Sequence, residues 1–334
     1  PKARLLAASF KAHHPGARCH VCLVETRMPD GAADWPEFDR LVLARDLDWP
    51  VPFGRVAAGK TPMEAATAVK ARWLHACFAD QPSEDRVVFL DPDVWVLSPF
   101  AELEAAWTRH AIVLIPHLLA PGNLAMERSA LSRGAYNLGF LALRRAPESE
   151  AFLAWWSERL IHACRDDRAQ GLFTDQKWVD LAPGFFPVGL LKHPGYNLAP
   201  WSVGERGLEE EGGAWRADGA PVRFAHFSGW DRGVWFWAAR TWGGGRTAVW
   251  ERLGETYRAA LAGTVPAGWR SAAWSYARLA PRAGGPLRRR ALRDPDFLPD
   301  RDPFAMSRAQ LAVAAGTWAL RRLRRRLRSP GGRE

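Results

Sequence analysis

The sequence lacks a disulfide framework. Its 334 residues include only four cysteines, and Cys19 and Cys22 lie together in an apolar run typical of a β-strand. Residues three apart on a strand face opposite sides of the sheet, so this pair can neither close a disulfide nor jointly hold a metal. Unpaired cysteines are typical of a reducing compartment, and we therefore expect a cytoplasmic location.

Long hydrophobic runs and an evenly spread charge are also missing. The longest apolar candidate, residues 311–320, is too short to span a membrane and contains Gly316. Residues 264–334 contain no lysine, and their 16 arginines and 5 acidic residues give a net charge of +11. The whole chain carries +10, so the first 263 residues carry −1. Nothing in that near-neutral part favours nucleic-acid binding.

The sequence does contain alternating strand-like and helix-like segments. Apolar runs predict strands at 18–24, 87–90, 111–115, 136–143, 185–192 and 221–227, and longer patterns predict helices at 2–13, 62–78, 147–164 and 247–261. This alternation favours an α/β fold with a mixed, mostly parallel sheet flanked by helices. Such a sheet normally begins with a strand, whereas this sequence begins with a helix, so we expect the first strand to be missing.

The strand at 87–90 ends in two carboxylates, Asp91 and Asp93, separated by Pro92. Ligands of α/β sheets bind beyond the carboxyl ends of the strands, where this pair lies. In an extended chain residues i and i+2 project to the same side, so the pair can hold one divalent cation together with substrate phosphates. On this segment alone a plain turn after a core strand remains an open interpretation.

Three later segments form, together with this strand, an ordered set of sequence motifs. They are Y-N-L-G-F at 136–140, T-D-Q-K-W at 174–178 and H-F-S-G-W-D-R at 226–232. With F-L-D-P-D-V at 89–94 they resemble the D-x-D, Asn-x-Gly, Asp-Gln and H-x-x-G-x-x-K motifs of the metal-dependent GT-A glycosyltransferases, in the group of bacterial lipopolysaccharide galactosyltransferases and glycogenin. The resemblance covers about residues 1–240 and departs from the family at Arg232, which replaces a lysine, and at the missing first strand.

The resemblance implies a role for each motif. Asp91, Asp93 and His226 would bind Mn²⁺ or Mg²⁺. Asp175 and Gln176 would be the catalytic pair facing the donor sugar. The residues that bind the cofactor and donor would be Lys70, Asn137, Gly139, Gly229 and Arg232.

The implied reaction moves a sugar from a nucleotide-sugar donor, UDP-linked and with retention, to a cell-envelope glycan or its lipid-linked precursor. The departing nucleoside diphosphate gains negative charge, which a divalent cation and the Arg232 guanidinium would stabilise. A neutral amide at Gln176 is a poor nucleophile, so we expect it to stabilise a cationic sugar centre.

Two other functions stay open. A strand followed by D-x-D is also the nucleophile motif of haloacid-dehalogenase-like phosphatases, although the later G-D-x-x-x-D-like acidic pair is not found here. A non-catalytic sugar-binding protein would keep the fold without turnover. Two residues also have a purely structural interpretation. His226 could be a core histidine whose hydrogen bonds are all made within the protein, and Lys70 could be a solvated helix residue.

The charge pattern predicts three regions. Residues 1–263 would form the GT-A domain, 264–304 a proline-rich linker or extension, and 305–334 a basic amphipathic helix. In that helix Leu320, Leu323 and Leu327 share one face, and six arginines surround them. This composition is typical of a helix lying on an anionic membrane surface, which predicts a peripheral position at the inner face of the cell membrane. A docking helix with a solvated basic end fits the same pattern.

Overall fold

A four-stranded mixed sheet forms the centre of the fold. The computed structural model describes residues 1–265, 272–280 and 285–328. The strand order is β3 (Arg86–Leu90), β6 (Phe140–Arg144), β5 (Ile112–Leu114) and β9 (Val188–Leu190). The β3–β6 and β5–β6 ladders are antiparallel and the β5–β9 ladder is parallel. The predicted α/β class with a mixed sheet is confirmed, and only one of these three ladders is parallel.

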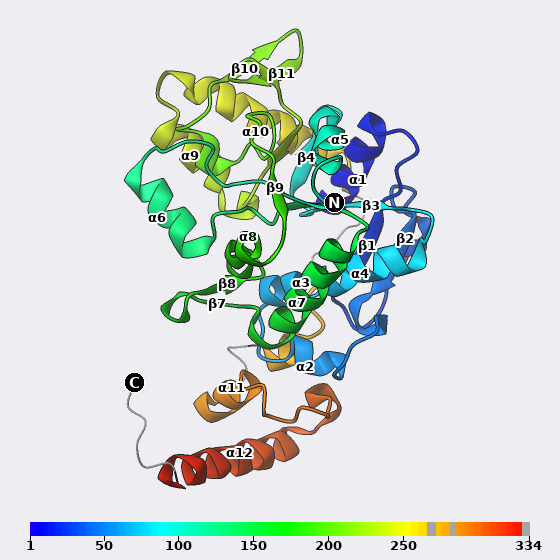
Figure 1. The fold of residues 1–334 in the computed structure, drawn as a ribbon, viewed down its shortest axis with the longest axis vertical. Helices are drawn as coiled ribbons and strands as arrows, with labels where there is room; N and C mark the ends of the chain where they lie inside the picture. The colour runs from blue at the N-terminus through cyan, green and yellow to red at the C-terminus, as the bar shows by residue number, and fades with distance from the viewer. Residues whose placement is uncertain (266–271, 281–284, 329–334) are drawn as a thin grey trace.

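Helices cover both faces of this sheet because its strands are apolar on both sides (Figure 1). Ile112 and Leu114 of β5 pack in one core with α4 (Lys70–Asp80) and α7 (Pro147–Ala163). Val113, between them, packs in a second core with α5 (Ala101–Trp107), against which α1 (Lys2–His13) also lies. Two buried faces explain why β5 reads as a continuous apolar run in the sequence.

Smaller ladders flank the main sheet. β1 (His20–Leu23) pairs in parallel with β2 (Arg40–Leu43). β4 (Val94–Val96) pairs antiparallel with β13 (Phe224–His226), and β7 (Arg165–Asp167) with β8 (Leu172–Thr174). A meander that the sequence did not predict joins β10 (Leu208–Glu211), β11 (Ala214–Ala217) and β12 (Ala220–Pro221).

Most of the aromatic residues are core residues. A third core forms around α9 (Val234–Trp242) and α10 (Thr247–Ala262), and it buries Trp235 and Trp250 completely. In the same core the rings of Phe227 and Tyr257 stack with centroids 3.7 Å apart. This core lies directly beyond β13, so it fixes the end of the strand that carries His226.

The helix predicted at 62–78 is two helices. The capping box at its start is present, since the Glu64 backbone N–H donates to Thr61 Oγ1 and the Thr61 N–H donates to the Glu64 carboxylate. The chain then breaks at Val69, which separates α3 (Pro62–Ala68) from α4. The break makes Lys70 the first residue of α4. The remaining short helices are α2 (Phe53–Ala57), α6 (Leu124–Arg133) and α8 (Ala182–Phe185).

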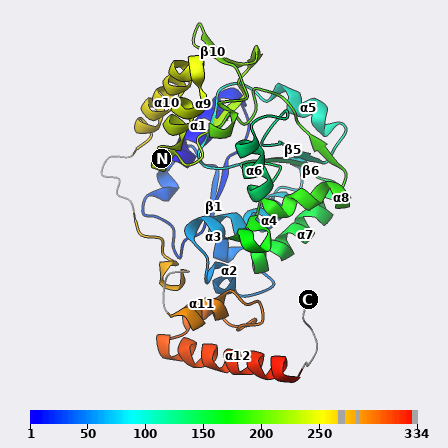
Figure 2. The same cartoon turned by 90° about the vertical axis from the view of Figure 1, so that its left-hand side faces the viewer.

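The C-terminal part packs as a fourth core. The segment 264–304, predicted as a linker, contains α11 (Pro286–Leu292), and α12 (Arg308–Arg328) follows it. Leu292, Phe297 and Leu311 pack with Ala58, the residue after α2, because this segment carries apolar side chains between its prolines. Figures 1 and 2 place α12 beside α11 at one end of the molecule. Residues 329–334 of the predicted basic helix, and the side chains of 325–328, lie outside the described part. Among the helices described, none combines the length and apolar character needed to cross a membrane.

Candidate active site

A tight turn creates the centre of the site. The Val94 N–H donates to the Asp91 carbonyl at 3.0 Å, with Pro92 in the second position that favours proline in such turns. The prediction that the chain stays extended through Asp91 and Asp93 is therefore wrong, and the turn interpretation holds. The turn sends β4 alongside β13, where Val94 pairs with His226 across the ladder.

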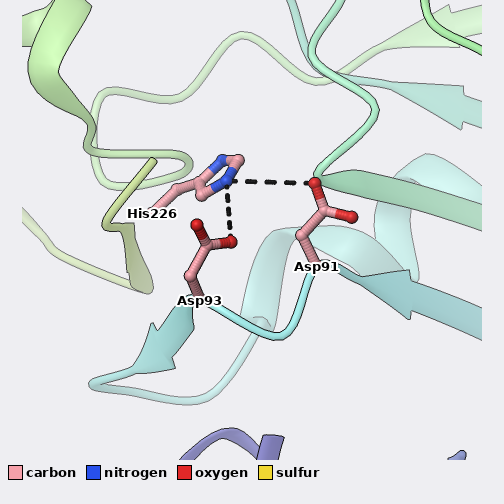
Figure 3. Close-up of side chains that lie close together, drawn as sticks. All are labelled: Asp91, Asp93 and His226. Atoms are coloured by element: carbon pink, nitrogen blue, oxygen red, sulfur yellow. Dashed lines mark ion pairs between the residues drawn. The ribbon is translucent and has the colours of Figure 1, made fainter. Parts of the chain in front are cut away.

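The turn nevertheless brings the predicted metal-binding side chains together. One ligand atom from each of Asp91, Asp93 and His226 lies within 4.8 Å of the others. His226 Nε2 is 3.2 Å from Asp93 Oδ1 and 3.9 Å from Asp91 Oδ2 (Figure 3). The imidazole is buried whereas both carboxylates are partly exposed. The group is therefore open to solvent on its carboxylate side.

Hydrogen bonds orient the His226 ring and place a proton on its Nδ1. The Leu138 N–H donates to Gln176 Oε1 at 3.0 Å, and Asn137 Nδ2 donates to the same oxygen at 3.2 Å. Asn137 Oδ1 therefore faces the other way, where it accepts from the Gly139 N–H at 3.2 Å and from His226 Nδ1 at 3.1 Å. Because that oxygen only accepts, Nδ1 carries a proton, and Nε2 is the nitrogen that faces the carboxylates.

Gly139 lets this chain of hydrogen bonds close. A Cβ atom at this position would lie 2.4 Å from His226 Cε1 and 2.8 Å from Asn137 Oδ1. The glycine of the Asn-Leu-Gly segment is thus required by the close approach of the imidazole, and any side chain would displace His226.

Lys70 lies behind the carboxylates as a buried cation. Its Nζ is 3.1 Å from Asp91 Oδ1 and 3.0 Å from Asp175 Oδ2, and it donates to the Leu138 carbonyl at 2.9 Å. Burial lowers the pKa of Lys70, but Asp175 and Asp91 outweigh it and the pKa is raised. The interpretation of Lys70 as a solvated helix residue is therefore wrong, since its side chain is only 4% exposed.

The Asp-Gln pair lies in the turn between β8 and the 3₁₀ helix Lys177–Leu181. Thr174 Oγ1 donates to Asp175 Oδ1 at 3.0 Å, and Trp156 Nε1 donates to the Asp175 carbonyl at 3.0 Å. The amide of Gln176 also donates to the Arg133 carbonyl at 3.1 Å. Both predicted catalytic side chains are buried and bonded to the framework that holds Asp91, Asp93 and His226 in place. Their contact with a donor sugar remains a prediction.

The site concentrates negative charge. Burial raises the pKa of Asp91, against the opposing effect of Lys70 and His226. Burial also acts to raise the pKa of Asp93, but the neighbouring imidazole outweighs it and the pKa is lowered. For His226 the lowering by burial is overcome by Asp93 and Asp91, so its pKa is raised. Burial thus sets the direction for Asp91, and the close pairing of His226 with the carboxylates sets it for Asp93 and His226.

Gly229 and Arg232 lie in the turn that follows β13. Gly229 has φ of +72°, a conformation that favours glycine. The Arg232 side chain is exposed, and within the described residues no ion pair involves it. Burial, Arg168 and also Arg232 lower the pKa of Arg133 at the end of α6. Arg232 and Arg168 thus act on Arg133, whose backbone carbonyl accepts from Gln176 of the hydrogen-bonded group around His226.

The sequence analysis missed three residues of the site: His117, Trp201 and Arg133. His117 Nε2 accepts from Asn137 Nδ2 at 3.3 Å, and burial lowers its pKa to about 4. Trp201 meets both His117 and His226 edge to face, with ring centroids 5.0 and 5.6 Å apart. His117 follows strand β5 as Asp91 follows β3, so the carboxyl-end rule could have found it. No sequence signal marked Trp201 or Arg133.

Comparison with known proteins gives distant relatives. No family model matches the chain. Two curated Bacillus subtilis (strain 168) proteins are similar, both described as uncharacterized: YfnF, 27% identical over 172 residues (50% of this chain, 57% of YfnF), and YfnD, 22% identical over 178 residues (52% of this chain, 56% of YfnD). The matches thus span little more than half of either relative's length.

Two solved structures match part of this chain. One is the galactosyltransferase LgtC in complex with donor and acceptor sugar analogues, 14% identical, covering 75% of this chain and 90% of that one with a TM-score of 0.42. The other is a glycosyltransferase involved in glycosylation of the major capsid of PBCV-1, 12% identical, covering 64% and 84% with a TM-score of 0.35. Both are glycosyltransferases, the class that the motifs resemble. The identities and TM-scores are low, so the function proposed below is argued from the geometry of the site.

Proposed function

We propose that this protein is a metal-dependent GT-A glycosyltransferase that moves a sugar from a UDP-linked donor, with retention, to a glycan or lipid-linked acceptor of the cell envelope. The observation that carries this proposal is the group of Asp91, Asp93 and His226 at the end of an α/β sheet strand. The order of the four motifs along the chain supports the choice of reaction.

The residues fit a divalent cation. Two carboxylates and one imidazole form a mixed oxygen and nitrogen donor set, which suits Mn²⁺ better than Mg²⁺. The bond from His226 Nδ1 to Asn137 Oδ1 keeps Nε2 free to ligate. When bound, the cation would act as a Lewis acid that stabilises the departing nucleoside diphosphate.

The surrounding side chains hold this arrangement. Lys70 fixes Asp91 and Asp175 through ion pairs and reduces the repulsion between their carboxylates. Gln176 orients Asn137 and thereby His226, so we assign it a positioning role in addition to the predicted contact with the sugar. The exposed guanidinium of Arg232 would offset charge on the diphosphate, the role of the lysine in the resembled family.

The alternatives receive less support. A phosphatase of the haloacid-dehalogenase type carries a later G-D-x-x-x-D-like acidic pair, which the sequence lacks, and the third member of the group that could hold a metal is a histidine, His226. A sugar-binding protein would keep the same geometry, and only turnover separates it from an enzyme.

The test is release of UDP from a panel of UDP-sugars with Mn²⁺ and, in parallel, with EDTA. The proposal predicts Mn²⁺-dependent release that Asp93→Asn abolishes and the exposed control Asp30→Asn retains. Proton NMR of the first-formed product should show the anomeric configuration of the donor. Release of phosphate from p-nitrophenyl phosphate, or binding of UDP-sugars without turnover, would contradict the proposal in favour of the respective alternative.

We also propose that α12 lies on an anionic membrane surface. Its inner face buries Leu311 and Ala315, while Val313, Leu320 and Leu323 on the outer side are 71%, 59% and 55% exposed. Exposed arginines at 321 and 324 flank this second apolar stripe. A helix that only docks on the protein needs only the inner face, so the exposed outer stripe indicates a second binding partner. The positive charge of the flanking arginines suits anionic lipid headgroups, whose attraction is about 1 kcal/mol per arginine.

Vesicle sedimentation tests this location. The chain should bind phosphatidylglycerol vesicles at low salt, bind less at high salt, and bind phosphatidylcholine vesicles weakly. Arg321→Glu/Arg324→Glu should remove the binding, whereas Arg27→Glu, an exposed arginine elsewhere, should not. Equal binding to both lipids would contradict the electrostatic account.

A further inference from the structure

A small pocket lies where the C-terminal segment packs against the main domain. Its walls are α2 and the residues after it, the end of α7 with the start of β7, and the end of α11 with the residues after it. Figures 1 and 2 show α11 next to α2. The pocket has a volume of about 20 Å³, enough for one atom the size of a water oxygen. None of the described lining residues is acidic, and five are basic: Arg55, Lys60, His162, Arg165 and Arg293.

Two arginines hold the end of α11 on the main domain. Arg55 Nη1 and Nη2 donate to the carbonyls of Leu292 and Asp294 at 3.4 and 3.0 Å. Arg165 Nη1 donates to the Arg293 carbonyl at 3.2 Å. These bonds satisfy carbonyls at a helix end, so both arginines have a structural role. They use only part of the N–H groups that each guanidinium carries.

Buried donors without a good partner remain beside the pocket. Lys60 is 8% exposed, and its Nζ donates to the Ile161 carbonyl at a long 3.4 Å. Within the described part of the chain no ion pair involves this lysine. Arg165 Nε is buried without a hydrogen-bond partner, and the Asp167 carboxylate lies 4.0 Å from it. The pocket is thus lined by donors for which the surrounding protein supplies too few acceptors.

The charge of Lys60 is poorly compensated by its surroundings. Burial lowers its pKa to about 8, against the opposing effect of Cys164 and Glu64. Arg55 and Arg165 lower the pKa further. The Glu64 carboxylate already accepts from two backbone N–H groups. A buried cation without a counter-charge costs stability, and an anion in the pocket would supply that charge.

We propose that this pocket binds a phosphoryl group, with one oxygen beside Lys60 and the others toward the exposed side chains of His162 and Arg293. The pocket volume suits a single oxygen, and these two exposed residues are placed to meet the remaining ones. Guanidinium groups present paired N–H donors that match the oxygens of phosphate, whereas a spherical chloride ion uses only their charge. Because Lys60 of the main domain and Arg293 after α11 would share one anion, its binding should tighten the attachment of the C-terminal segment.

Two sources of the phosphoryl group fit this position. Inorganic phosphate is one, and a phospholipid headgroup is the other. Asp294, beside the pocket, pairs with Arg322 of α12. The pocket and the helix that we place on a membrane surface therefore belong to the same packed unit, and the experiment has one arm for each source.

Calorimetric titration with sodium phosphate, in a gluconate buffer at pH 7, measures the first source. The full chain should bind one phosphate, and Lys60→Met and Arg165→Gln should each weaken binding by about ten-fold or more because a charge-assisted donor is lost. Arg27→Gln, which removes an exposed arginine elsewhere, should leave it unchanged. Lys60→Met removes an uncompensated buried charge and should fold at least as stably as the unaltered chain, so its weaker binding would not reflect unfolding.

Sedimentation with vesicles of phosphatidic acid in phosphatidylcholine measures the second source. If the headgroup supplies the phosphoryl group, Lys60→Met and Arg165→Gln should sediment less than Arg27→Gln. A difference between these variants and the control in either arm supports the site and names its source. Equal behaviour of all the variants in both arms would reduce the effect to nonspecific attraction by a chain of net charge +10 and overturn the proposal. Chloride binding as tight as phosphate binding would also contradict it. The phosphate titration involves neither sugar transfer nor a membrane, so its result is independent of the functions proposed above.

Discussion

The ion pairs of Lys70 with Asp91 and Asp175 predict a large loss of stability when the cation is removed. Lys70→Met keeps most of the side-chain length and removes the ammonium group, with its two ion pairs and its hydrogen bond to the Leu138 carbonyl. Lys70 and Asp175 are 4% and 3% exposed, so Asp175 would be left as an uncompensated buried charge. Breaking such a pair costs about 3–5 kcal/mol. Asp91 is 27% exposed and partly solvated, so it should add little to this cost.

Differential scanning calorimetry measures the effect. At about 2 °C per kcal/mol for a chain of this size, the midpoint should fall by roughly 6–10 °C. Adding Asp175→Asn keeps the hydrogen bond from Thr174 and removes the uncompensated carboxylate charge. The double variant should therefore recover at least half of the lost stability. A loss of less than about 1 kcal/mol in the free energy of unfolding of Lys70→Met would refute the account of a buried charge network, as would no recovery in the double variant.

Two further changes test the interior. Burial lowers the pKa of Lys60 to about 8, and Arg55 reinforces this shift whereas Glu64 opposes it. Between about pH 8 and 10.5 the unfolded chain therefore binds more protons than the folded chain. The free energy of unfolding should rise with pH across this window. Lys60→Met should therefore stabilise the folded chain by about 3 kcal/mol at pH 7 and by little at pH 10.5, as measured by urea unfolding. A gain in stability that does not depend on pH would contradict the burial argument. Gly139→Ala should cost about 1–3 kcal/mol and weaken Mn²⁺ binding because its Cβ meets His226, whereas Gly122→Ala, with open space around it, should change neither.

Local patterns in the sequence predicted much of the fold. Apolar runs located β3, β5 and β13, and the Thr61 capping box located the start of α3, because these depend on nearby residues alone. The break at Val69 and the meander of β10 to β12 had no comparable signal. They depend on packing between distant segments, which a single sequence does not display.

The grouping of three side chains was predictable from the sequence, and its geometry was less so. The four motifs named Asp91, Asp93 and His226, and the structure brings them together. The observed geometry differs from the predicted one. The Asp-Pro-Asp segment forms a turn instead of staying extended, and the pairing of β4 with β13 places the imidazole beside the carboxylates. Trp201 entered the site only through tertiary packing.

The central claim is that Asp91, Asp93 and His226 form a divalent-cation site, and Mn²⁺ binding without nucleotide tests it most directly. Electron paramagnetic resonance of free Mn²⁺ during titration gives the affinity for the unaltered chain, Asp93→Asn and the exposed control Asp30→Asn. The account predicts one site whose affinity falls by about ten-fold or more in Asp93→Asn, since a ligand and its charge are lost together, and stays unchanged in the control. Equal affinity in all three proteins would contradict it.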